Sequence, residues 1–318
     1  MVRDEDIKLS KSIQQRTGRT FHVATRLLPE RIRRPTYVLY AFFRVADEVV
    51  DRPDAPPPAE QRAELERIRR GALGDPDVDD AVLSAFSDLR ERHGIPDEEV
   101  DTFVDAMCSD VDRDRYETHE DLAAYMRGSA VAVGNMMVDV MDPAEAEAAR
   151  PHAAALAEAF QLTNFLRDVR EDVREYGRVY LPLETLERHG VTEEQLAAAE
   201  VTDGFRAAMA AELVRTERRY REGVAGIRYL PADCQFGVLL AAVLYAEHHR
   251  LIRDRDYDVL TATPELTRRR RLWLVARTWW HWRRHRDPET AFYAASCLSE
   301  GPESTAAPPD IAGAEHPV

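Results

Sequence analysis

The chain has 318 residues, of which 44% are hydrophobic and 32% are charged, and its formal net charge is −15. The apolar fraction is enough for a large core, while the acidic balance argues against nucleic acid as a partner, because phosphate backbones are bound by clustered Lys and Arg. The same charge argues against electrostatic docking on anionic lipid. Three scattered Cys without a CxxC pair, and an N-terminus without an apolar signal core, predict a cytoplasmic protein with reduced thiols.

Arginine supplies almost all of the positive charge. Lys8 and Lys11 are the only lysines among the 43 basic residues. An acidic, lysine-poor surface is typical of proteins from a high-salt cytoplasm, where screening reduces self-repulsion. A genome that favours Arg codons is the alternative explanation. We expect a halophilic protein, and equal folding and activity without salt would contradict that expectation.

The composition favours helices throughout, because Ala, Leu, Arg and Glu dominate it. The sequence has no alternating runs of β-branched residues bounded by turn pairs, so strands are not expected. Thr192 and Gln195 have the spacing of a capping box, which predicts a short helix there. We expect one helical domain over residues 1–298 and a disordered tail over residues 299–318. Gly and Pro divide the domain into stretches of helical length, with breaks expected at Pro29, 52–58, 71–76, 94–96, 142–143, 177–182, Gly190, Gly204 and Pro231.

The first informative segment covers residues 40–51, in which nothing breaks a helix. Asp47 and Asp51 are four residues apart, so on a helix their carboxylates lie on one face. Tyr40 and Arg44 continue the same stripe, and the neighbouring residues are apolar. An acidic pair on a packed helix needs a counter-charge, which either Arg44 or a divalent cation would supply.

A second acidic pair lies in residues 161–172. Asp168 and Asp172 again share one helical face, and Gln161 and Asn164 extend that face towards the N-terminus. Two such faces, about 120 residues apart in sequence, can oppose each other across a helical bundle.

These residue types predict a magnesium site. Four carboxylates and two amides without nearby Cys or His suit Mg²⁺, with Mn²⁺ as a substitute, and do not suit zinc. Mg²⁺ is usually bound by one or two carboxylates and by substrate phosphates, so a diphosphate ligand is expected. The alternative is that each pair is a solvated helix face, salt-bridged to Arg. That would be the better interpretation of one pair alone, but two matched pairs on otherwise apolar helices favour the metal site.

Two further segments carry less information. Residues 125–134 are rich in small side chains, which either leave volume for a ligand or let two helices approach closely, and close packing is the safer expectation. The Trp-rich stretch over residues 272–282 is expected to be a core helix rather than a membrane contact.

The motifs resemble those of the squalene/phytoene synthase family, and within it they look most like those of phytoene synthases. The resemblance covers most of the chain, and the order and spacing of the motifs make it specific. The matching stretches are an opening helix at 20–29, two aspartate-rich motifs at 40–51 and 161–172, the GRVYLP sequence at 177–182, and Tyr245 with the YDV sequence at 257–259.

The resemblance implies the all-helical class I terpene synthase fold with a central cavity, and it implies roles for individual residues. The metal ligands would be Asp47, Asp51, Asn164, Asp168 and Asp172. The four aspartates, together with Tyr125 and Tyr245, would be catalytic. The side chains implied to bind substrate are Phe21, Tyr40, Arg44, Gln161, Asn164 and Arg167.

Some positions depart from the family pattern or are harder to place. Glu48 stands where many relatives have Asp, which is conservative. Val131 stands where many have Gly, a change that could reshape the pocket. Arg268 to Arg271 are the candidates for basic residues that reach the diphosphates from the C-terminal third.

The implied activity is a prenyltransferase reaction. Two geranylgeranyl diphosphates would be condensed head to head, through cyclopropyl (prephytoene) diphosphate, to phytoene in the first committed step of carotenoid synthesis. One alternative is a squalene or dehydrosqualene synthase that uses two farnesyl diphosphates. Another is a non-catalytic relative that acts as an assembly or scaffold protein, which the presence of all four aspartates disfavours. A chain-elongating enzyme is weaker still, because its DDxxD motif is absent.

Prenyl diphosphates are thus the expected partners. Peripheral contact with the inner membrane face stays open, because the product is a long-chain lipid. The length of the prenyl chain, the use of NADPH, the final base, the oligomeric state and regulation stay open as well.

Overall fold

The computed structural model describes residues 24–51 and 56–299, so Phe21 and the expected tail from residue 300 lie outside the described residues. Within these ranges the regular secondary structure is helical, and a lone β-bridge joins Arg115 and Val179. The elements are α3 (Glu30–Val50), α4 (Pro58–Ala72), α5 (Ala81–His93), α6 (Asp97–Ser109), α7 (His119–Met126), the π-helix η1 (Arg127–Val131), α8 (Ala132–Met141), α9 (Ala146–Arg167), α10 (Val169–Glu175), α11 (Leu183–Arg188), α12 (Glu193–Ala197), α13 (Asp203–Val224), the 3-10 helix η2 (Ile227–Tyr229), α14 (Ala232–Asp254), α15 (Arg268–His285) and α16 (Pro288–Ala295).

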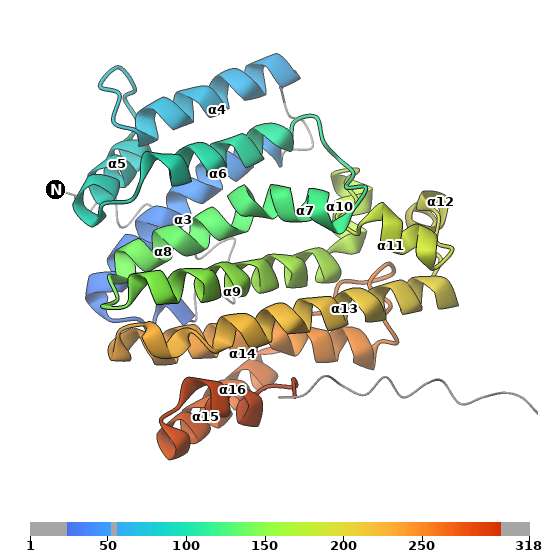
Figure 1. Cartoon of the computed structure of the whole chain (residues 1–318). Coiled ribbons are helices and arrows are strands. Elements are labelled where there is room, and N and C mark those ends of the chain that lie inside the picture. Colours follow the sequence, from blue (N-terminus) through green and yellow to red (C-terminus); the bar gives the residue numbers. More distant parts are fainter. Residues whose placement is uncertain (1–23, 52–55, 300–318) are drawn as a thin grey trace, which may run out of the picture.

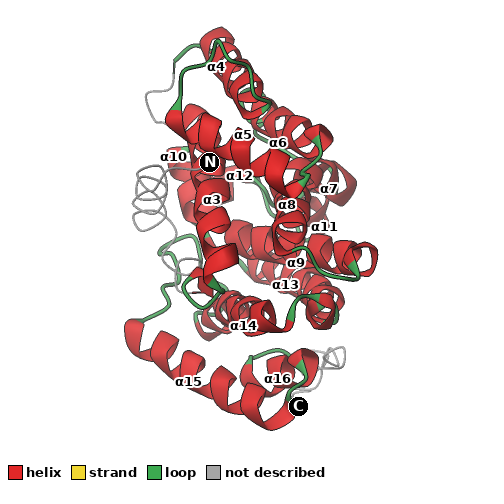
Figure 2. Cartoon of the chain, turned by 90° about the vertical axis from the view of Figure 1, so that its left-hand side faces the viewer, coloured by secondary structure: helices red, strands yellow, loops and turns green. Residues whose placement is uncertain are grey.

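The long helices form a layered bundle (Figure 1). α9 is its central helix, because it packs against α8 on one side and against α13 and α14 on the other. α3 and α6 extend the bundle beyond α8, and α4 and α5 cover them. α15 and α16 pack on α14 at the opposite end (Figure 2).

Burial of aromatic and aliphatic side chains between these layers stabilises the bundle. One cluster joins α3, α5 and α6, where the ring of Phe42 stacks on that of Phe86 at a centroid distance of 3.9 Å and also contacts Phe103. A second cluster lies among α9, α13, α14 and α16. A third includes residues of α10, α11, α12 and α13 and of the loop after α14. The apolar stripes of the long helices therefore meet in three clusters between the layers.

Most of the predicted breaks lie at helix boundaries. Pro29 precedes α3, and Gly94 ends α5 with a φ of 65°, a left-handed conformation that glycine adopts readily. Thr192 and Gln195 form the predicted capping box at the start of α12.

Gly204 is an exception to that pattern. It lies inside the first turn of α13 rather than at a break, because Thr202 caps the helix two residues earlier. A Cβ atom on Gly204 would lie 2.2 Å from the carbonyl oxygen of His189, so close backbone approach explains the glycine.

The two acidic segments lie at helix ends rather than within uninterrupted helices. Asp51 follows the last residue of α3, and Asp168 separates α9 from α10 with φ −101° and ψ 13°. The i to i−4 hydrogen bonds persist, since the N–H groups of Asp51 and Asp172 donate to the carbonyl oxygens of Asp47 and Asp168 at 2.9 Å. Each pair therefore keeps its helical spacing, while Asp51 and Asp168 occupy positions where Asp is better tolerated than in a helix interior.

The Trp-rich helix α15 is not the core helix that the sequence suggested. Trp273, Trp279 and Trp280 are 44%, 50% and 54% exposed. α15 is the outermost layer of the bundle and only its inner face, with Leu274 and Thr278, is covered by neighbouring helices. In the two described ranges, no helix combines the length and apolarity that a membrane span requires.

Candidate active site

A cavity of about 610 Å³ lies between α3, α6, η1, α9, α10 and α14, within the size range of small-molecule sites. Every predicted site residue in the described ranges lines it, although these residues come from distant parts of the chain. They are Tyr40, Arg44, Asp47, Asp51, Tyr125, Gln161, Asn164, Arg167, Asp168, Asp172 and Tyr245. Phe21 precedes the described residues and is not placed.

The first acidic pair lies at the polar end of this cavity. Arg44 forms an ion pair with Asp47, with 3.4 Å between Nη1 and Oδ2, and also approaches Glu48. Burial raises the pKa of Asp47 to about 7, and the negative charge of Asp51 adds to the shift. The arginine therefore compensates only part of the negative charge here.

The second acidic pair comes from the junction of α9 and α10. Arg167 holds Asp168 in place through a hydrogen bond of 2.8 Å from Nε to Oδ1. Burial raises the pKa of Asp172 to about 8, and the negative charges of Asp168 and Glu171 add smaller increases. Asp51 also raises the pKa of Asp172, so the two acidic segments are close enough to interact electrostatically.

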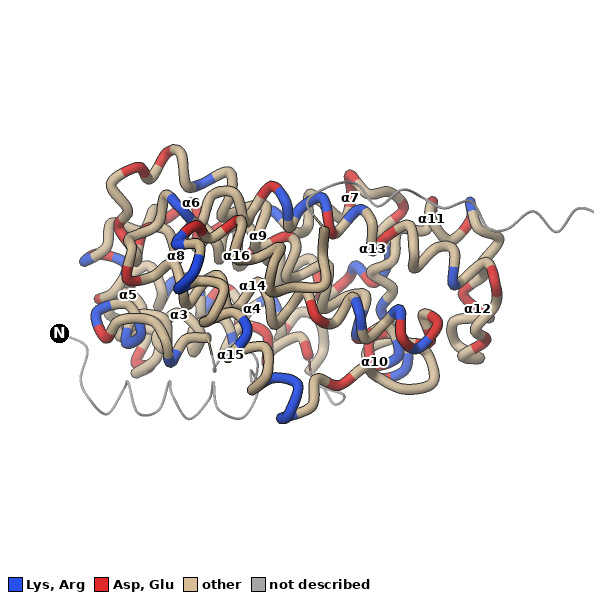
Figure 3. The backbone as a smooth tube through the Cα atoms, turned by 90° about the horizontal axis from the view of Figure 1, so that it is seen from below, with Lys and Arg blue, Asp and Glu red and all other residues tan. Residues whose placement is uncertain are grey.

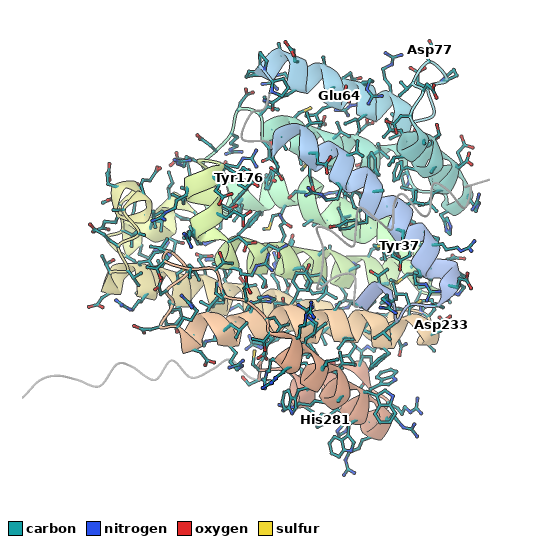
Figure 4. All side chains as sticks on the ribbon, turned by 180° about the vertical axis from the view of Figure 1, so that it is seen from behind. Tyr37, Glu64, Asp77, Tyr176, Asp233 and His281 are labelled. Atoms are coloured by element: carbon teal, nitrogen blue, oxygen red, sulfur yellow. The ribbon has the colours of Figure 1, made fainter. Side chains whose placement is uncertain are left out.

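Arg178, to which no role was assigned from the sequence, links the two acidic segments. Its guanidinium donates to Asp51 Oδ1 at 2.7 Å and to the carbonyl oxygen of Val50 at 3.0 Å. It also lies over the ring of Tyr176, which Figure 4 labels near the end of α3. The signal that could have identified Arg178 was its position in the 177–182 stretch, directly after the second acidic motif.

Asp110, at the C-terminal end of α6, is a further acidic residue of the cavity that the sequence analysis missed. Tyr125 donates its hydroxyl hydrogen to Asp110 Oδ2 at 2.8 Å, and the rings of Tyr116 and Tyr180 pack around Tyr125. Burial raises the pKa of Asp110 to about 7, although the Arg178 charge opposes the shift. Asp114 stands four residues after Asp110, but it does not line the cavity, so the i, i+4 spacing does not mark this pair as part of the site.

This end of the cavity fits a hard divalent cation. Among the described residues, no three or more His, Cys, Asp or Glu are grouped so that they could hold a metal ion. Mg²⁺ does not require such a group, since it usually takes one or two carboxylates and completes its coordination with water and phosphate oxygens. Burial, and after it the charges of neighbouring carboxylates, raises the pKa values of Asp47, Asp110 and Asp172, so ionising all of them leaves a surplus of buried negative charge. Divalent cations bound at this end would offset that surplus and leave coordination positions for phosphate oxygens.

The other end of the cavity is lined by apolar side chains. A second cavity of about 150 Å³, lined almost entirely by apolar side chains and glycines, shares four lining residues with the first. They are Val133, Met137, Ala157 and Phe160. The polar groups therefore gather at one end of a pocket whose remaining wall suits a hydrocarbon chain.

The small residues at 125–134 serve both of the functions considered for them. A Cβ atom on Gly128 would lie 2.3 Å from the carbonyl oxygen of Thr102, so this glycine lets η1 pack closely on α6. Ser129 and Ala130 of the same π-helix line the main cavity. Val131 is buried but does not line it, so the expected effect of this residue on the pocket has no support in the geometry.

Arg268 to Arg271 do not line the main cavity, in contrast to the suggestion that they reach the diphosphates. Arg270 pairs with Glu247 instead, with 2.7 Å between Nε and Oε1. Among the described residues, the arginines that line the cavity are Arg44, Arg167 and Arg178.

Comparison with known proteins identifies similar sequences and folds. A family model described as squalene/phytoene synthase matches residues 14–272. A phytoene synthase of Rhodobacter capsulatus is 33% identical over 282 residues, which cover 87% of this chain and 81% of the relative. A 15-cis-phytoene synthase of Synechococcus elongatus is 33% identical over 262 residues, which cover 78% and 84%.

Solved structures give the same picture. A dehydrosqualene synthase in complex with ligand aligns with a TM-score of 0.77 and 26% identity, covering 86% of this chain and 94% of that chain. A squalene synthase from Alicyclobacillus acidocaldarius aligns with a TM-score of 0.71 over 80% of this chain and 95% of its own, and at 24% identity it supports the fold alone. The helical bundle is thus that of the terpene synthases.

Proposed function

The chain belongs to the squalene/phytoene synthase family, and from that premise we propose that it condenses two geranylgeranyl diphosphates head to head to phytoene. It is a prenyltransferase by membership of that family. The observation that carries the proposal is one cavity with two acidic pairs and three arginines at its polar end and a hydrocarbon-lined extension at the other. Relatives named phytoene synthase match most of the chain, which favours the C20 substrate.

At the polar end, the chain would bind and neutralise diphosphate. Asp47, Asp51, Asn164, Asp168 and Asp172 would hold Mg²⁺, or Mn²⁺ in its place. When bound, the metal supplies positive charge that stabilises the departing diphosphate. The guanidinium groups of Arg44, Arg167 and Arg178 lie in the same wall and would bind the remaining phosphate oxygens. Because these cations are held before the reaction begins, they stabilise the growing charge without reorganisation.

In the proposed reaction, the allylic C–O bond of the first substrate breaks and diphosphate leaves with both electrons. The double bond of the second substrate attacks the cation, and loss of a proton closes a cyclopropane that still carries diphosphate. That diphosphate then leaves in turn, and the cyclopropylcarbinyl cation rearranges to the 1-1′ linkage. Loss of a second proton gives the central double bond of the triene.

Water would add to the carbocations of this reaction, and the apolar wall excludes it from the cavity. Phe160 stacks on Tyr245 with 4.5 Å between ring centroids, and this aromatic pair lies in the cavity wall beside Gln161. Tyr40, Tyr125 and Tyr245 line the same space, where their aromatic rings would stabilise the cationic carbons.

Three further parts of the proposal concern the whole protein. We propose one catalytic domain over residues 1–298, a cytoplasmic location, and adaptation to high salt. The net charge of −15 with only two lysines supports the last point. Thermal unfolding measured from low to molar salt would test it, since a midpoint independent of salt would contradict the adaptation.

Product analysis tests the proposed reaction. The protein is incubated with Mg²⁺ and labelled C15 or C20 diphosphate, with and without NADPH, and the lipid extract is separated by chromatography. A C40 triene from the C20 substrate, without need of NADPH, is the expected product. A preferred C30 product would assign the chain to squalene or dehydrosqualene synthesis, and no condensed product from either substrate would refute the prenyl transfer.

A further inference from the structure

The Trp-rich helix α15 presents its apolar stripe to solvent. Large hydrophobic side chains that are exposed are rare in the described residues, and four of the five lie on this helix; the fifth is Leu27. Leu272, Trp273, Trp279 and Trp280 recur at helical spacing, so they form one face. A contiguous exposed apolar face of this kind marks an interaction surface.

The charge of this helix is opposite to that of the whole protein. Residues 268–286 contain eight Arg and no Asp or Glu, in a chain whose net charge is −15. Four arginines at the two ends of α15 are exposed and have no ion-pair partner within the described ranges: Arg268, Arg269, Arg283 and Arg284. Figure 3 views the molecule from the side on which α15 lies and marks its arginines in blue. The acidic balance that argued against anionic lipid therefore does not apply to this surface.

The aromatic and basic side chains of α15 form one ordered surface. The guanidinium of Arg270 lies over the ring of Trp273 at 4.1 Å, and that of Arg283 lies over Trp279 at 4.9 Å. Each contact keeps a cation stacked on an indole ring. His281, labelled in Figure 4, lies on this helix at the end of the molecule remote from α4.

We propose that α15 docks the protein on an anionic lipid membrane, with its axis along the surface and its indole rings at the level of the headgroups. Trp is enriched at membrane interfaces, and helices that lie in this plane combine an apolar face with a basic flank. A second copy of the chain fits this surface poorly, because two Arg-rich faces would repel each other. An apolar protein partner would leave the flanking arginines without counter-charges.

The position of α15 gives this docking a consequence for the proposed function. On the inner face of the bundle, Gly237, Val238 and Ala241 of α14 line the apolar cavity. On the side towards α15, Phe236 of α14 packs against Trp282 at a ring-centroid distance of 6.4 Å. A single helix, α14, thus separates the hydrocarbon end of the pocket from the proposed membrane surface. A lipid product formed in the pocket would therefore be released close to the membrane.

Tryptophan fluorescence tests the docking directly, because all four Trp of the chain lie in α15. The full chain is titrated with vesicles of phosphatidylglycerol or of phosphatidylcholine at low and high salt. Phosphatidylglycerol vesicles are expected to shift the emission to shorter wavelength and to protect it from acrylamide, and phosphatidylcholine vesicles to do neither. An unchanged emission with both lipids, or equal shifts with both, would overturn the proposal.

Variants separate the apolar and the electrostatic contributions in a vesicle co-sedimentation assay. The apolar variant combines Trp279→Ser with Trp280→Ser, and its control is Leu27→Ser, at another exposed apolar residue. The electrostatic variant combines Arg283→Gln with Arg284→Gln, and its control is Arg188→Gln, at an exposed arginine of α11. The arginine variant is expected to bind about tenfold more weakly, since each basic residue near an anionic surface contributes a several-fold effect. The tryptophan variant is expected to weaken by a similar factor, since it removes two indole rings from the apolar face. Each control should bind like the unmodified protein.

Turnover with detergent-dispersed substrate checks that the variants are folded. It should stay unchanged in all of them, because none of these side chains lines the main cavity. Retained vesicle binding in both α15 variants would refute the assignment of the surface. So would a dimer in solution whose Trp emission is already shifted without vesicles, since a second copy would then cover the helix.

Discussion

Arg178 donates a hydrogen bond from Nη1 to Asp51 Oδ1 at 2.7 Å, although 127 residues separate the two in the chain. The backbone N–H of Arg178 also donates to the carbonyl oxygen of Asp172 at 2.8 Å. One residue therefore ties the end of α3 to the acidic turn of α10. This link explains how two acidic segments from distant parts of the sequence meet at one end of the cavity.

Replacement of Arg178 should impair both the architecture and the charge of the site. Arg178→Gln is expected to lower kcat by about 100-fold or more, the scale observed when one preorganised charge-stabilising group is lost. Arg178→Lys keeps the charge but not the forked geometry, so it should recover only part of the rate. The double variant with Asp51→Asn is expected to show non-additive unfolding free energies, because the two side chains interact directly. Strict additivity in denaturant titrations would contradict the proposed link.

Loss of one carboxylate from either acidic pair should abolish turnover while the fold persists. Asp47→Asn and Asp168→Asn keep the side-chain shape but remove a charged oxygen ligand, which Mg²⁺ requires. Asp77→Asn is the matched control, since Asp77 is exposed in the loop between α4 and α5, away from the cavity (Figure 4). Turnover is measured with circular dichroism as the check on folding. Near-normal activity in either cavity variant would remove that aspartate from the proposed metal site.

The sequence predicted the two acidic faces because their information is local. Spacing alone places Asp47 near Asp51 and Asp168 near Asp172, and these pairs indeed line one cavity. Asp110 and Arg178 escaped notice because their partners are distant in sequence, and no periodicity encodes such contacts.

The environment of α15 could not be predicted for a related reason. A helical pattern shows which residues share a face but not whether another helix covers that face. Trp273 and Trp280 follow the spacing of a core helix, and only the position of α15 at the edge of the bundle leaves them exposed.

The buried carboxyls predict a pH dependence of stability. The pKa values of Asp47 and Asp110 are raised to about 7 and that of Asp172 to about 8, chiefly by burial. A raised pKa in the folded state contributes stability that is present below the unfolded value of about 4 and is lost as the pH rises through the folded value. Without metal, the midpoint of thermal unfolding should therefore fall as the pH rises from 6.5 to 8.5, while unperturbed histidines, with a pKa of about 6.5, lose their remaining charge at the lower end of this window.

Mg²⁺ with inorganic diphosphate should oppose that loss. Metal ligands must be deprotonated, so binding strengthens as these carboxyls lose their protons. The stabilisation by Mg²⁺ and diphosphate is expected to be larger at pH 8.5 than at pH 6.5 in thermal unfolding scans. Calorimetry in buffers of different ionisation enthalpy should detect proton release near pH 7. Equal stabilisation at both pH values, with no proton released, would argue against these carboxyls as the binding site.

The length of the apolar extension should govern the choice of substrate. Ala157 lines both cavities, so Ala157→Phe is expected to fill space where the two adjoin. The ratio of kcat/KM for the C20 substrate to that for the C15 substrate should fall by about tenfold or more, since differences of a few methylenes have effects of this size. Retained C15 turnover would show that the variant is folded. An unchanged ratio would mean that the prenyl chain lies elsewhere.

The account depends most on the convergence of both acidic pairs on one diphosphate. A crystal structure with Mg²⁺ and a non-hydrolysable prenyl thiodiphosphate tests that claim most directly. We predict metal ions that join the diphosphate to carboxylates of both pairs, Asp47 with Asp51 and Asp168 with Asp172, and a prenyl chain directed past Ala157. A diphosphate bound away from these four side chains, or held by one pair with the other turned to solvent, would contradict it.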